Sequence, residues 1–389
     1  AFRHALVQEA AYATILLRNR VQLHAGIADF LERLQPERVE DIADHLVQGR
    51  QTERAIPYLV AAGERAARSY AVPAAVSRLE LATQHMDDST DDDLLRRAYE
   101  TLGQAKESVF DIEGAAAAYG QLRTNGDARD NVPMQVSGTN KLAFVTGLFM
   151  GDRDQGLGDL AAAEEIARAQ KDDVGLAEAC MFQCFLHTGS GEFDEVQHYM
   201  NEVIRLGEAT GQHHATLFGM THLANTLTLL TRFDEALEQA EKTIALAQEL
   251  DNLKFQAELL TFVIPITNMQ LGNPGVAMEA LERGMEIPWH IGDRASETFA
   301  AVLQGKGAMM QGYLEDGLSL FRRSMEAADA TGIPYMIALS RCVTGTGYLQ
   351  FGGAMTQRAL DLHMQTLELM EMPTGKTYGT CLWSEIASC

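Results

Sequence analysis

The clearest potential for metal binding in this 389-residue sequence lies in two cysteines and a histidine that follow one another closely. Cys180, Cys184 and His187 stand at positions i, i+4 and i+7, so a helix would place all three on one face. Thiolates and imidazoles are ligands that Zn²⁺ prefers, but a site needs a fourth. The candidates for that ligand are three later histidines, His213, His214 and His222. Small thiols on the apolar stripe of a helix are more often core residues, so we expect no metal site and no cofactor.

Three glycine-containing motifs look like parts of nucleotide-binding loops. The segment 373–377, Pro-Thr-Gly-Lys-Thr, contains the Gly-Lys-Thr of a phosphate-binding loop. That motif needs a glycine five residues earlier and a strand before it, whereas position 370 is Met370 and a helical pattern precedes it. The segments 156–158 (Gly-Leu-Gly) and 345–347 (Gly-Thr-Gly) lack the third glycine of a dinucleotide loop. We interpret the first motif as a turn between helices and the other two as sites of close helix packing.

The sequence offers no recognisable catalytic constellation. It has no nucleophile in a Gly-x-Ser-x-Gly context and no His-Glu-x-x-His motif. Its carboxylate pairs, such as Asp234 and Glu235, precede helical patterns, where acidic side chains cap a helix and interact favourably with its dipole. We therefore predict that the chain is not an enzyme.

An internal repeat predicts the elements that carry these residues. The segments 191–211 and 231–251 share a tight turn, then Phe-Asp-Glu, then an amphipathic helix. Weaker copies occupy 71–87, 111–127, 154–170, 272–287, 312–332 and 355–371. No stretch alternates between apolar and polar residues as a strand would. The chain is predicted to be all-α.

The small residue that opens the second helix of each copy gives the period. The eight aligned positions are Ala75, Ala115, Gly156, Val196, Ala236, Ala277, Gly317 and Ala359, at steps of 40 to 42 residues. A step of about 40 residues holds two helices and two short turns, and small residues suit the point where paired helices cross. We predict a TPR-like solenoid of helical hairpins, wound as a right-handed superhelix. It would span residues 51–389 in about eight helix pairs, of which the last could be truncated.

Charge is distributed unevenly along the chain. Residues 1–85 contain ten basic and ten acidic side chains, so the remaining 21 basic and 44 acidic ones carry the whole net charge of −23. Such a surface repels nucleic-acid phosphates and anionic membranes, whereas a basic or apolar partner fits it more easily. The simpler alternative is that acidic helices only keep a long array in solution. No apolar run approaches the ~20 residues that cross a bilayer, and five cysteines form no disulfide framework, so we expect a cytoplasmic protein.

Residues 2–68 contain a more specific pattern. Two stretches carry it, Phe-x-His-Ala-Leu-x-Gln-Glu-x-Ala-Tyr with a later Leu-His-x-x-Ile-Ala, and Ala-x-His with a later Ala-x-x-Tyr-x-x-x-Ala-Gly-Glu-x-Ala. The residues concerned are Phe2, His4, Ala5, Leu6, Gln8, Glu9, Ala11, Tyr12, Leu23, His24, Ile27, Ala28, Ala43, His45, Ala55, Tyr58, Ala62, Gly63, Glu64 and Ala66. This part resembles STAND signal-transduction ATPases, in particular bacterial proteins that join a class III cyclase or a LuxR-type domain to an ATPase and TPR repeats. The resemblance implies that residues 1–50 end a winged-helix-like segment and its linking helices, and that the chain is a piece of a longer protein.

The same resemblance suggests a nucleotide sensor. In related STAND proteins a winged-helix histidine contacts the phosphate of bound ADP, and His4 matches it by position. An imidazole N–H can donate to a phosphate oxygen, although Ala5 stands where the family has an acidic residue. The alternative is that His4 packs between helices. In either case the sensor would act only in a full-length protein with a nucleotide domain.

The first helices of the pairs are rich in Met and Phe. The candidate groove residues are Phe149, Met181, Phe185, Phe218, Phe262, Met269, Phe299, Met309 and Met310. Flexible thioethers and aromatic rings on an inner face would suit an apolar helix or a ligand. The alternative is that these side chains form the core between stacked helices.

These features together predict a binding region without catalysis. We expect an effector- or protein-binding sensor region of a multidomain signalling ATPase, whose partner is a protein, a peptide or a small molecule. A standalone TPR adaptor without nucleotide control is the alternative. Self-association of the array is compatible with either.

Overall fold

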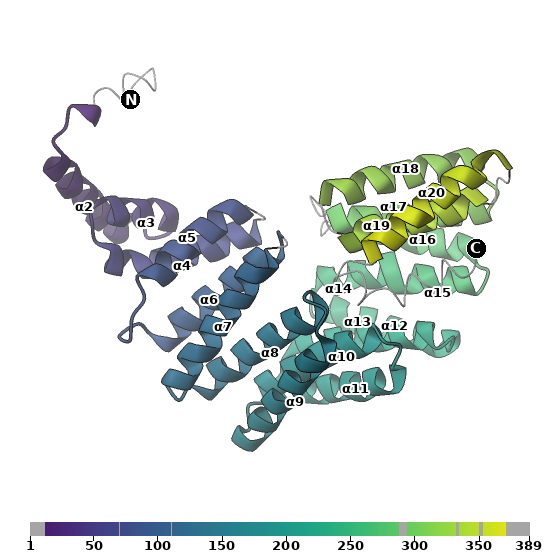
Figure 1. Cartoon of the computed structure of the whole chain (residues 1–389), viewed down its shortest axis with the longest axis horizontal. Coiled ribbons are helices and arrows are strands. Elements are labelled where there is room, and N and C mark those ends of the chain that lie inside the picture. Colours follow the sequence, from purple (N-terminus) through teal and green to yellow (C-terminus); the bar gives the residue numbers. More distant parts are fainter. Residues whose placement is uncertain are drawn as a thin grey trace. The chain divides into compact units, whose positions relative to one another are not determined.

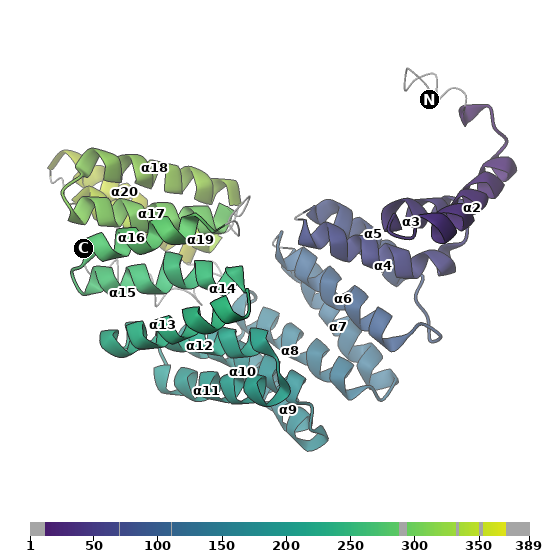
Figure 2. The same ribbon diagram turned by 180° about the vertical axis from the view of Figure 1, so that it is seen from behind.

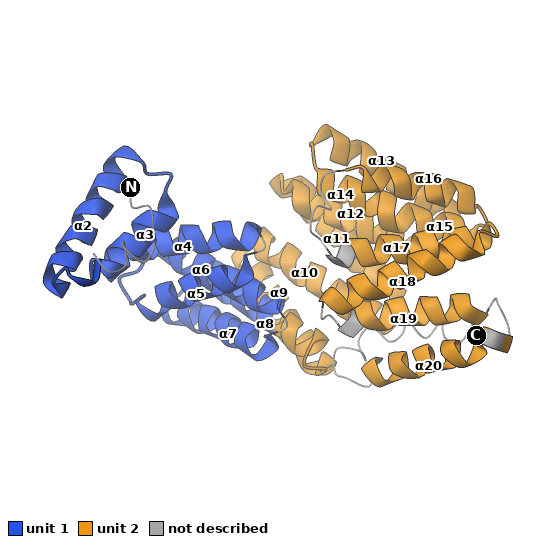
Figure 3. Cartoon of the chain, turned by 90° about the horizontal axis from the view of Figure 1, so that it is seen from above, with its two compact units in different colours: residues 1–142 blue, residues 143–389 orange. Residues whose placement is uncertain are grey.

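The computed structural model describes residues 12–69, 71–109, 111–287, 294–331, 334–349 and 353–370. Figure 1 shows this part of the chain as a succession of helices joined by short turns, and no strand occurs in it. The all-helical prediction is therefore confirmed. The chain divides into two compact units, residues 1–142 and 143–389 (Figure 3), which we describe separately.

In the first unit, apolar clusters join neighbouring helices. The helices are α2 (Leu17–Leu34), α3 (Val39–Gln48), α4 (Thr52–Arg68), α5 (Val72–Gln84), α6 (Asp92–Glu107), α7 (Ile112–Ala128) and the first part of α8 (Val132–Leu148). One cluster joins α2 to α7, from Ala28 to Ala118, and a second, formed by Leu95, Leu122 and Met134, joins α6 and α7 to α8. The α3 helix contacts both α2 and α4. A boundary at residue 50 between a winged-helix-like segment and the repeats stays a prediction.

In the second unit, helices follow in antiparallel pairs. After α8 come α9 (Arg153–Gln170), α10 (Asp173–Thr188), α11 (Phe193–Thr210), α12 (His213–Leu229), α13 (Phe233–Glu249), α14 (Leu253–Glu258), η1 (Leu259–Val263), α15 (Ile264–Gln270), α16 (Pro274–Met285), α17 (Arg294–Met310), α18 (Leu314–Thr331), α19 (Pro334–Leu349) and α20 (Gly353–Met370). Figure 2 shows α11 to α18 as roughly parallel rods, stacked in chain order. This stacking of helical hairpins is the arrangement that the repeat predicts.

The turns that separate the helices repeat with the same period. Residues with positive φ end successive first helices at Gly151, Gly191, Thr231, Gly272 and Gly312. Four others follow second helices at Asp130, Lys171, Gly211 and Asp251. A residue in the left-handed region ends a helix by turning the chain back. Several helices then start at an acidic or amide cap; for example, Asp152 and Asp172 accept hydrogen bonds from the backbone N–H groups of Gln155 and Gly175.

The small residues that defined the repeat lie where paired helices cross. All eight are buried, and each belongs to the second helix of its pair. At Gly156 a Cβ atom would come within 2.7 Å of the Ala143 carbonyl oxygen and 2.8 Å of the Gly147 Cα. Only a glycine at position 156 allows α8 and α9 to approach this closely, so Gly156 is a packing site, whereas a Cβ atom at Gly158 would meet nothing within 4 Å.

One first helix contains a π-helical segment. The second helix of this pair begins 21 residues after the first (Leu253 to Pro274), whereas the two preceding pairs need 20 (His213 to Phe233 and Asp173 to Phe193). The additional residue is accommodated in η1, which lies between α14 and α15. Pro265, the second residue of α15, lies two residues after η1 and has no N–H to donate. Single-turn π segments in α-helices frequently occur at functional sites.

The first helices of the second unit form the more tightly spaced row. Contacts join α12 to η1, η1 to α17, and α17 to α19. Across this row, the Thr228 and Thr267 hydroxyls are 2.6 Å apart. Within the described residues, no second helix contacts the second helix of the next pair to a comparable extent. A stack that is closer on one side curves toward that side, so the first helices form the inner face of this unit.

Candidate functional site

Aromatic side chains form a connected series on the inner face of the second unit. The Phe144 ring of α8 stacks on Phe182 of α10, with ring centres 4.5 Å apart. Phe144 and Phe218 both lie 5.6 Å from Phe185, and Phe218 is 4.1 Å from His222 on α12. We call Phe144, Phe182, Phe185, Phe218 and His222 the aromatic row. All except Phe218 are only partly buried, so the row is both a packing element and an accessible apolar surface.

A second aromatic contact continues this face beyond the row. Phe262 of η1 and Phe299 of α17 meet edge to face, with ring centres 5.3 Å apart. Phe182, His222 and Phe262 are separated by 40 residues each, so they occupy one position of three successive repeats. The π-helical segment thus presents an aromatic ring to the same face as α10 and α12.

Two charged side chains, Lys254 and Glu258, lie one turn apart on α14, which directly precedes η1. Lys254 places its Nζ 5.4 Å from the centre of the Phe255 ring. Glu258, one turn later, is half-buried, and burial raises the pKa of its carboxyl group while the charge of Lys254 opposes that shift. No hydrogen bond or ion pair reaches Glu258 from the residues that the structure describes. A carboxylate in this position lacks the partner that normally compensates for lost hydration.

His222 behaves as a neutral aromatic side chain. Burial, together with the charge of Lys254, lowers the pKa of the imidazole to about 4. The ring also lies 5.2 Å from Phe185. At neutral pH it therefore contributes apolar area and an N–H group, and no positive charge.

The candidate groove residues divide between the face and the core. Phe149, Met181, Phe185, Phe262 and Phe299 are partly exposed on first helices or directly after one. The buried ones are Phe218, Met269 and Met309. Met310 is 41% exposed at the end of α17. Their role in binding stays a prediction.

Sequence reasoning did not select Phe144, Phe182, Lys254 or Glu258, and it considered His222 only as a possible metal ligand. Phe182 and His222 share a repeat position with Phe262, which was selected, so alignment at 40-residue steps contains the signal for them. Lys254 and Glu258 gave no such signal, because charged residues on helices are common and only the fold shows which of them lack a partner.

The cysteines predicted to be core residues are buried. Burial raises the pKa of both the Cys180 and the Cys184 thiol to about 12, so both are protonated at neutral pH. His187 Nδ1 lies 2.5 Å from a Glu192 carboxylate oxygen, and its ring stacks on Tyr199. Within the described part of the chain, no group of three or more His, Cys, Asp or Glu side chains could hold a metal ion.

Two of the three glycine motifs can be located. Gly345 packs against His363, and Gly347 packs against Phe321. Like Gly156, they serve close helix packing. His4 and the segment 373–377 lie outside the described residues.

Three residues of the N-terminal signature meet in one hydrogen-bonded chain. The Tyr12 hydroxyl lies 2.8 Å from His24 Nε2, and His24 Nδ1 lies 2.7 Å from His45 Nδ1. Burial and the neighbouring His45 lower the pKa of His24. In this unit the signature residues therefore connect α2 to α3 and to the residues before α2.

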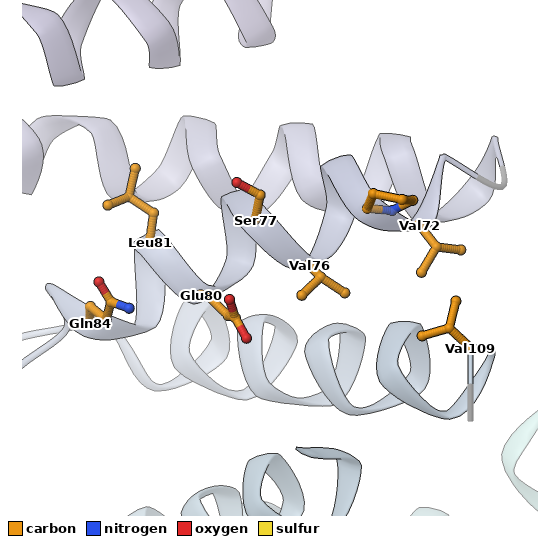
Figure 4. A pocket seen from close by; sticks show the side chains of 8 residues that line it. Val72, Val76, Ser77, Glu80, Leu81, Gln84 and Val109 are labelled. Atoms are coloured by element: carbon orange, nitrogen blue, oxygen red, sulfur yellow. The ribbon is translucent and has the colours of Figure 1, made fainter. Parts of the chain in front are cut away.

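Two shallow hollows occur away from the aromatic row. One, of about 500 Å³, lies over α5 and is lined by Val72, Val76, Leu81 and Val109 (Figure 4). Its acidic residue, Glu80, is paired with Lys106 at 2.7 Å. The other, of about 460 Å³, separates α13 from α16 on the outer side of the second unit. The charged residues of the second hollow, Glu241, Glu279 and Arg283, are exposed to solvent, whereas Glu258 is half-buried.

Comparison with known proteins identifies the fold class. No protein-family model matches the chain, and no curated protein matches it. Among solved structures, the Rap conjugation gene regulator of plasmid pLS20 in complex with the Phr* peptide has a TM-score of 0.56 at 12% identity, covering 81% of this chain and 96% of that one. A Rap protein complexed with Competence and Sporulation Factor gives 0.55 at 13%, covering 83% and 91%. The apo form of RapI gives 0.52 at 12%, covering 70% and 97%.

At these identities the similarity shows the fold alone. The chain is a TPR-like helical repeat protein in its architecture, as its 40-residue period predicts. No helix among the described residues is long and apolar enough to cross a membrane.

Proposed function

We propose that this chain is a peptide- or protein-binding region, and that the inner face of its second unit holds the partner. The single observation that supports this most strongly is the aromatic row, because four of its five rings stay partly exposed although they touch one another across three first helices. Aromatic side chains that combine rigid packing with accessible area are typical of binding surfaces. Exposed apolar patches of this kind on a soluble protein commonly mark interaction sites.

The solved structures of similar fold point in the same direction. Two of them are complexes, one with the Phr* peptide and one with Competence and Sporulation Factor. A fold can host many functions, so the argument for binding rests on the aromatic face and is only supported by these complexes.

We also propose the wider setting that residues 2–66 suggest. In a STAND-type regulator, the helical array binds an effector and relays this event to an ATPase and an output domain. The observation in favour is the N-terminal signature, of which Tyr12, His24 and His45 interact here. A standalone adaptor without nucleotide control remains the alternative function, and a cytoplasmic location fits both.

Selection of peptides by the intact 389-residue chain tests the binding proposal. A phage library of random hexapeptides is selected on immobilised protein, and the strongest binder is measured by fluorescence polarisation. Phe182→Ala and Phe185→Ala are each expected to weaken binding at least tenfold, because about 1.4 kcal/mol of contact energy corresponds to that factor. Phe30→Ala is the control, since Phe30 is an exposed ring (49%) on α2 of the first unit, and its removal deletes the same side-chain atoms. Failure to select any peptide, or equal loss in the control, would contradict the proposal.

A further inference from the structure

Glu258 occupies a repeat position that carries a ring in both neighbouring repeats and a carboxylate, Glu178, one repeat earlier. Glu258 lies 40 residues after Phe218 and 41 residues before Phe299, and the additional residue falls in η1. The helices that carry these three side chains are neighbours, because α12 contacts α14 and η1, and η1 contacts α17. Along three successive first helices, the order at this position is therefore buried ring, carboxylate, partly exposed ring.

The environment of Glu258 lacks a cation at bonding distance. Lys254 is the positive group whose field acts on Glu258. Its ammonium group lies over the Phe255 ring, and the two charges form no ion pair within 4 Å in the described structure. Ionised Glu258 is thus only half solvated and only partly compensated, which costs free energy in the unliganded protein.

We propose that Glu258, together with the partly exposed Phe299, binds an arginine or lysine side chain of the peptide partner. A guanidinium or ammonium group can donate hydrogen bonds to the carboxylate. The aromatic face of Phe299 attracts the same positive charge. This inference rests on the proposed function, since it names the chemistry of the peptide that the aromatic face holds.

The charge of the whole chain favours the same class of partner. The net charge is −23, and residues 86–389 contribute all of it. A field of this sign raises the local concentration of basic peptides and their association rate. Lys254 opposes this attraction locally, so its removal should strengthen the binding of a basic peptide.

The composition of the selected hexapeptides is the first test. Selection on the wild-type chain is expected to enrich Arg and Lys, accompanied by apolar residues, and selection on Glu258→Gln is expected to lose that enrichment. Peptides that depend on Phe182 and Phe185 but show no excess of Arg or Lys would overturn this inference and leave the proposed function intact. Absence of any selected peptide would overturn both.

A pair of peptides that match in shape and differ in charge gives the second test. The strongest Arg-containing hexapeptide is compared with the same peptide in which citrulline replaces Arg, so that shape is kept and charge is removed. We expect the citrulline peptide to bind wild type about tenfold more weakly, and Glu258→Gln to bind both peptides equally. A tenfold preference for Arg that persists in Glu258→Gln would contradict the assignment of Glu258.

The control variant is Lys254→Met, which keeps the aliphatic stem and removes the charge. It is expected to bind the Arg peptide several-fold more tightly than wild type does, with a smaller change for the citrulline peptide. The opposite sign, weaker binding of the Arg peptide, would contradict the inference that the positive side chain of the peptide binds beside Glu258 and Lys254.

Discussion

The first helices of the two units meet their neighbours through different chemistry. In the first unit, Arg97 of α6 donates two hydrogen bonds of 2.7 Å to the Glu64 carboxylate of α4. Glu100 of α6 accepts a hydrogen bond from the Ser137 hydroxyl of α8, and that hydroxyl in turn accepts a hydrogen bond from Lys141. In the second unit, the corresponding helices α8, α10 and α12 are joined by aromatic rings.

The polar groups that join the first helices of the first unit are already paired with one another. The aromatic row of the second unit keeps accessible apolar surface, and Glu258 has no paired cation in the described part of the chain. Charged pairs in the first unit already have their partners, so a ligand would have to replace existing bonds there. The aromatic row loses little when a peptide covers it, and Glu258 gains a partner. The same helical scaffold therefore serves mainly as structure in one unit and as a candidate binding face in the other.

The largest expected effect comes from breaking the aromatic row at its buried member. Phe218 is 8% exposed, so Phe218→Ala should lower the free energy of unfolding by about 3 kcal/mol through lost packing and the cavity left behind. Urea denaturation monitored by far-ultraviolet circular dichroism measures this change in the free energy of unfolding. A change below about 1 kcal/mol, the value we expect for Phe30→Ala in the first unit, would mean that the rings do not hold the second unit together.

The next largest effect is expected on acidification, which should lower the stability of the protein through His222. His222 titrates near pH 6.5 when unfolded and near pH 4 when folded, so the unfolded chain binds the extra proton in that window. The stability contribution is complete above pH 6.5 and is lost as the pH falls toward 4, by about 1–3 kcal/mol in total. His222→Phe removes this term, while His214, whose pKa is also lowered, still titrates in the variant. Parallel stability curves for wild type and His222→Phe between pH 7 and pH 4 would disprove the assignment.

Removal of a paired charge in the first unit should have a smaller effect. Arg97→Met deletes both hydrogen bonds to Glu64, and Arg97 is partly exposed, so the expected loss is about 1 kcal/mol. Binding of the selected hexapeptide should not change. A loss of peptide affinity comparable to that of Phe185→Ala would place the binding face in the first unit.

The smallest expected effect is an increase in stability, caused by the substitution Glu258→Gln. Because burial raises the pKa of Glu258, its contribution to stability is present below pH 4.5 and is lost as the pH rises through the folded pKa. Glu258→Gln should therefore stabilise the unliganded protein at pH 7 by a few tenths to about 1 kcal/mol, and by nothing at pH 4. A stabilised variant with weaker peptide binding indicates a functional carboxylate, whereas destabilisation at pH 7 would indicate a structural one.

The sequence predicted the scaffold well because close packing leaves a residue signature. A crossing such as that of Gly156 and Gly147 allows only small side chains, and it recurs every 40 to 42 residues. The step from Ala236 to Ala277, which includes the π-helical segment, is 41 residues, but so is the step from Ala115 to Gly156, which includes the regular helix α8, so the step length alone does not reveal η1.

The binding face was less predictable. Phe218 and Phe185 look alike in sequence, yet one is buried and the other partly exposed. Glu258 looks like any other acidic residue of a helix. Only the packing of η1 and its neighbours shows that no cation in the described structure pairs with it.

Hydrogen exchange of the intact chain, with and without the selected Arg-containing hexapeptide, tests the central claim most directly. The account predicts that the peptide slows amide exchange in the first helices of the second unit, namely α10, α12, η1 and α17, and leaves α4 and α6 unchanged. Protection confined to the second helices α11, α13 and α16, or to the first unit, would contradict it.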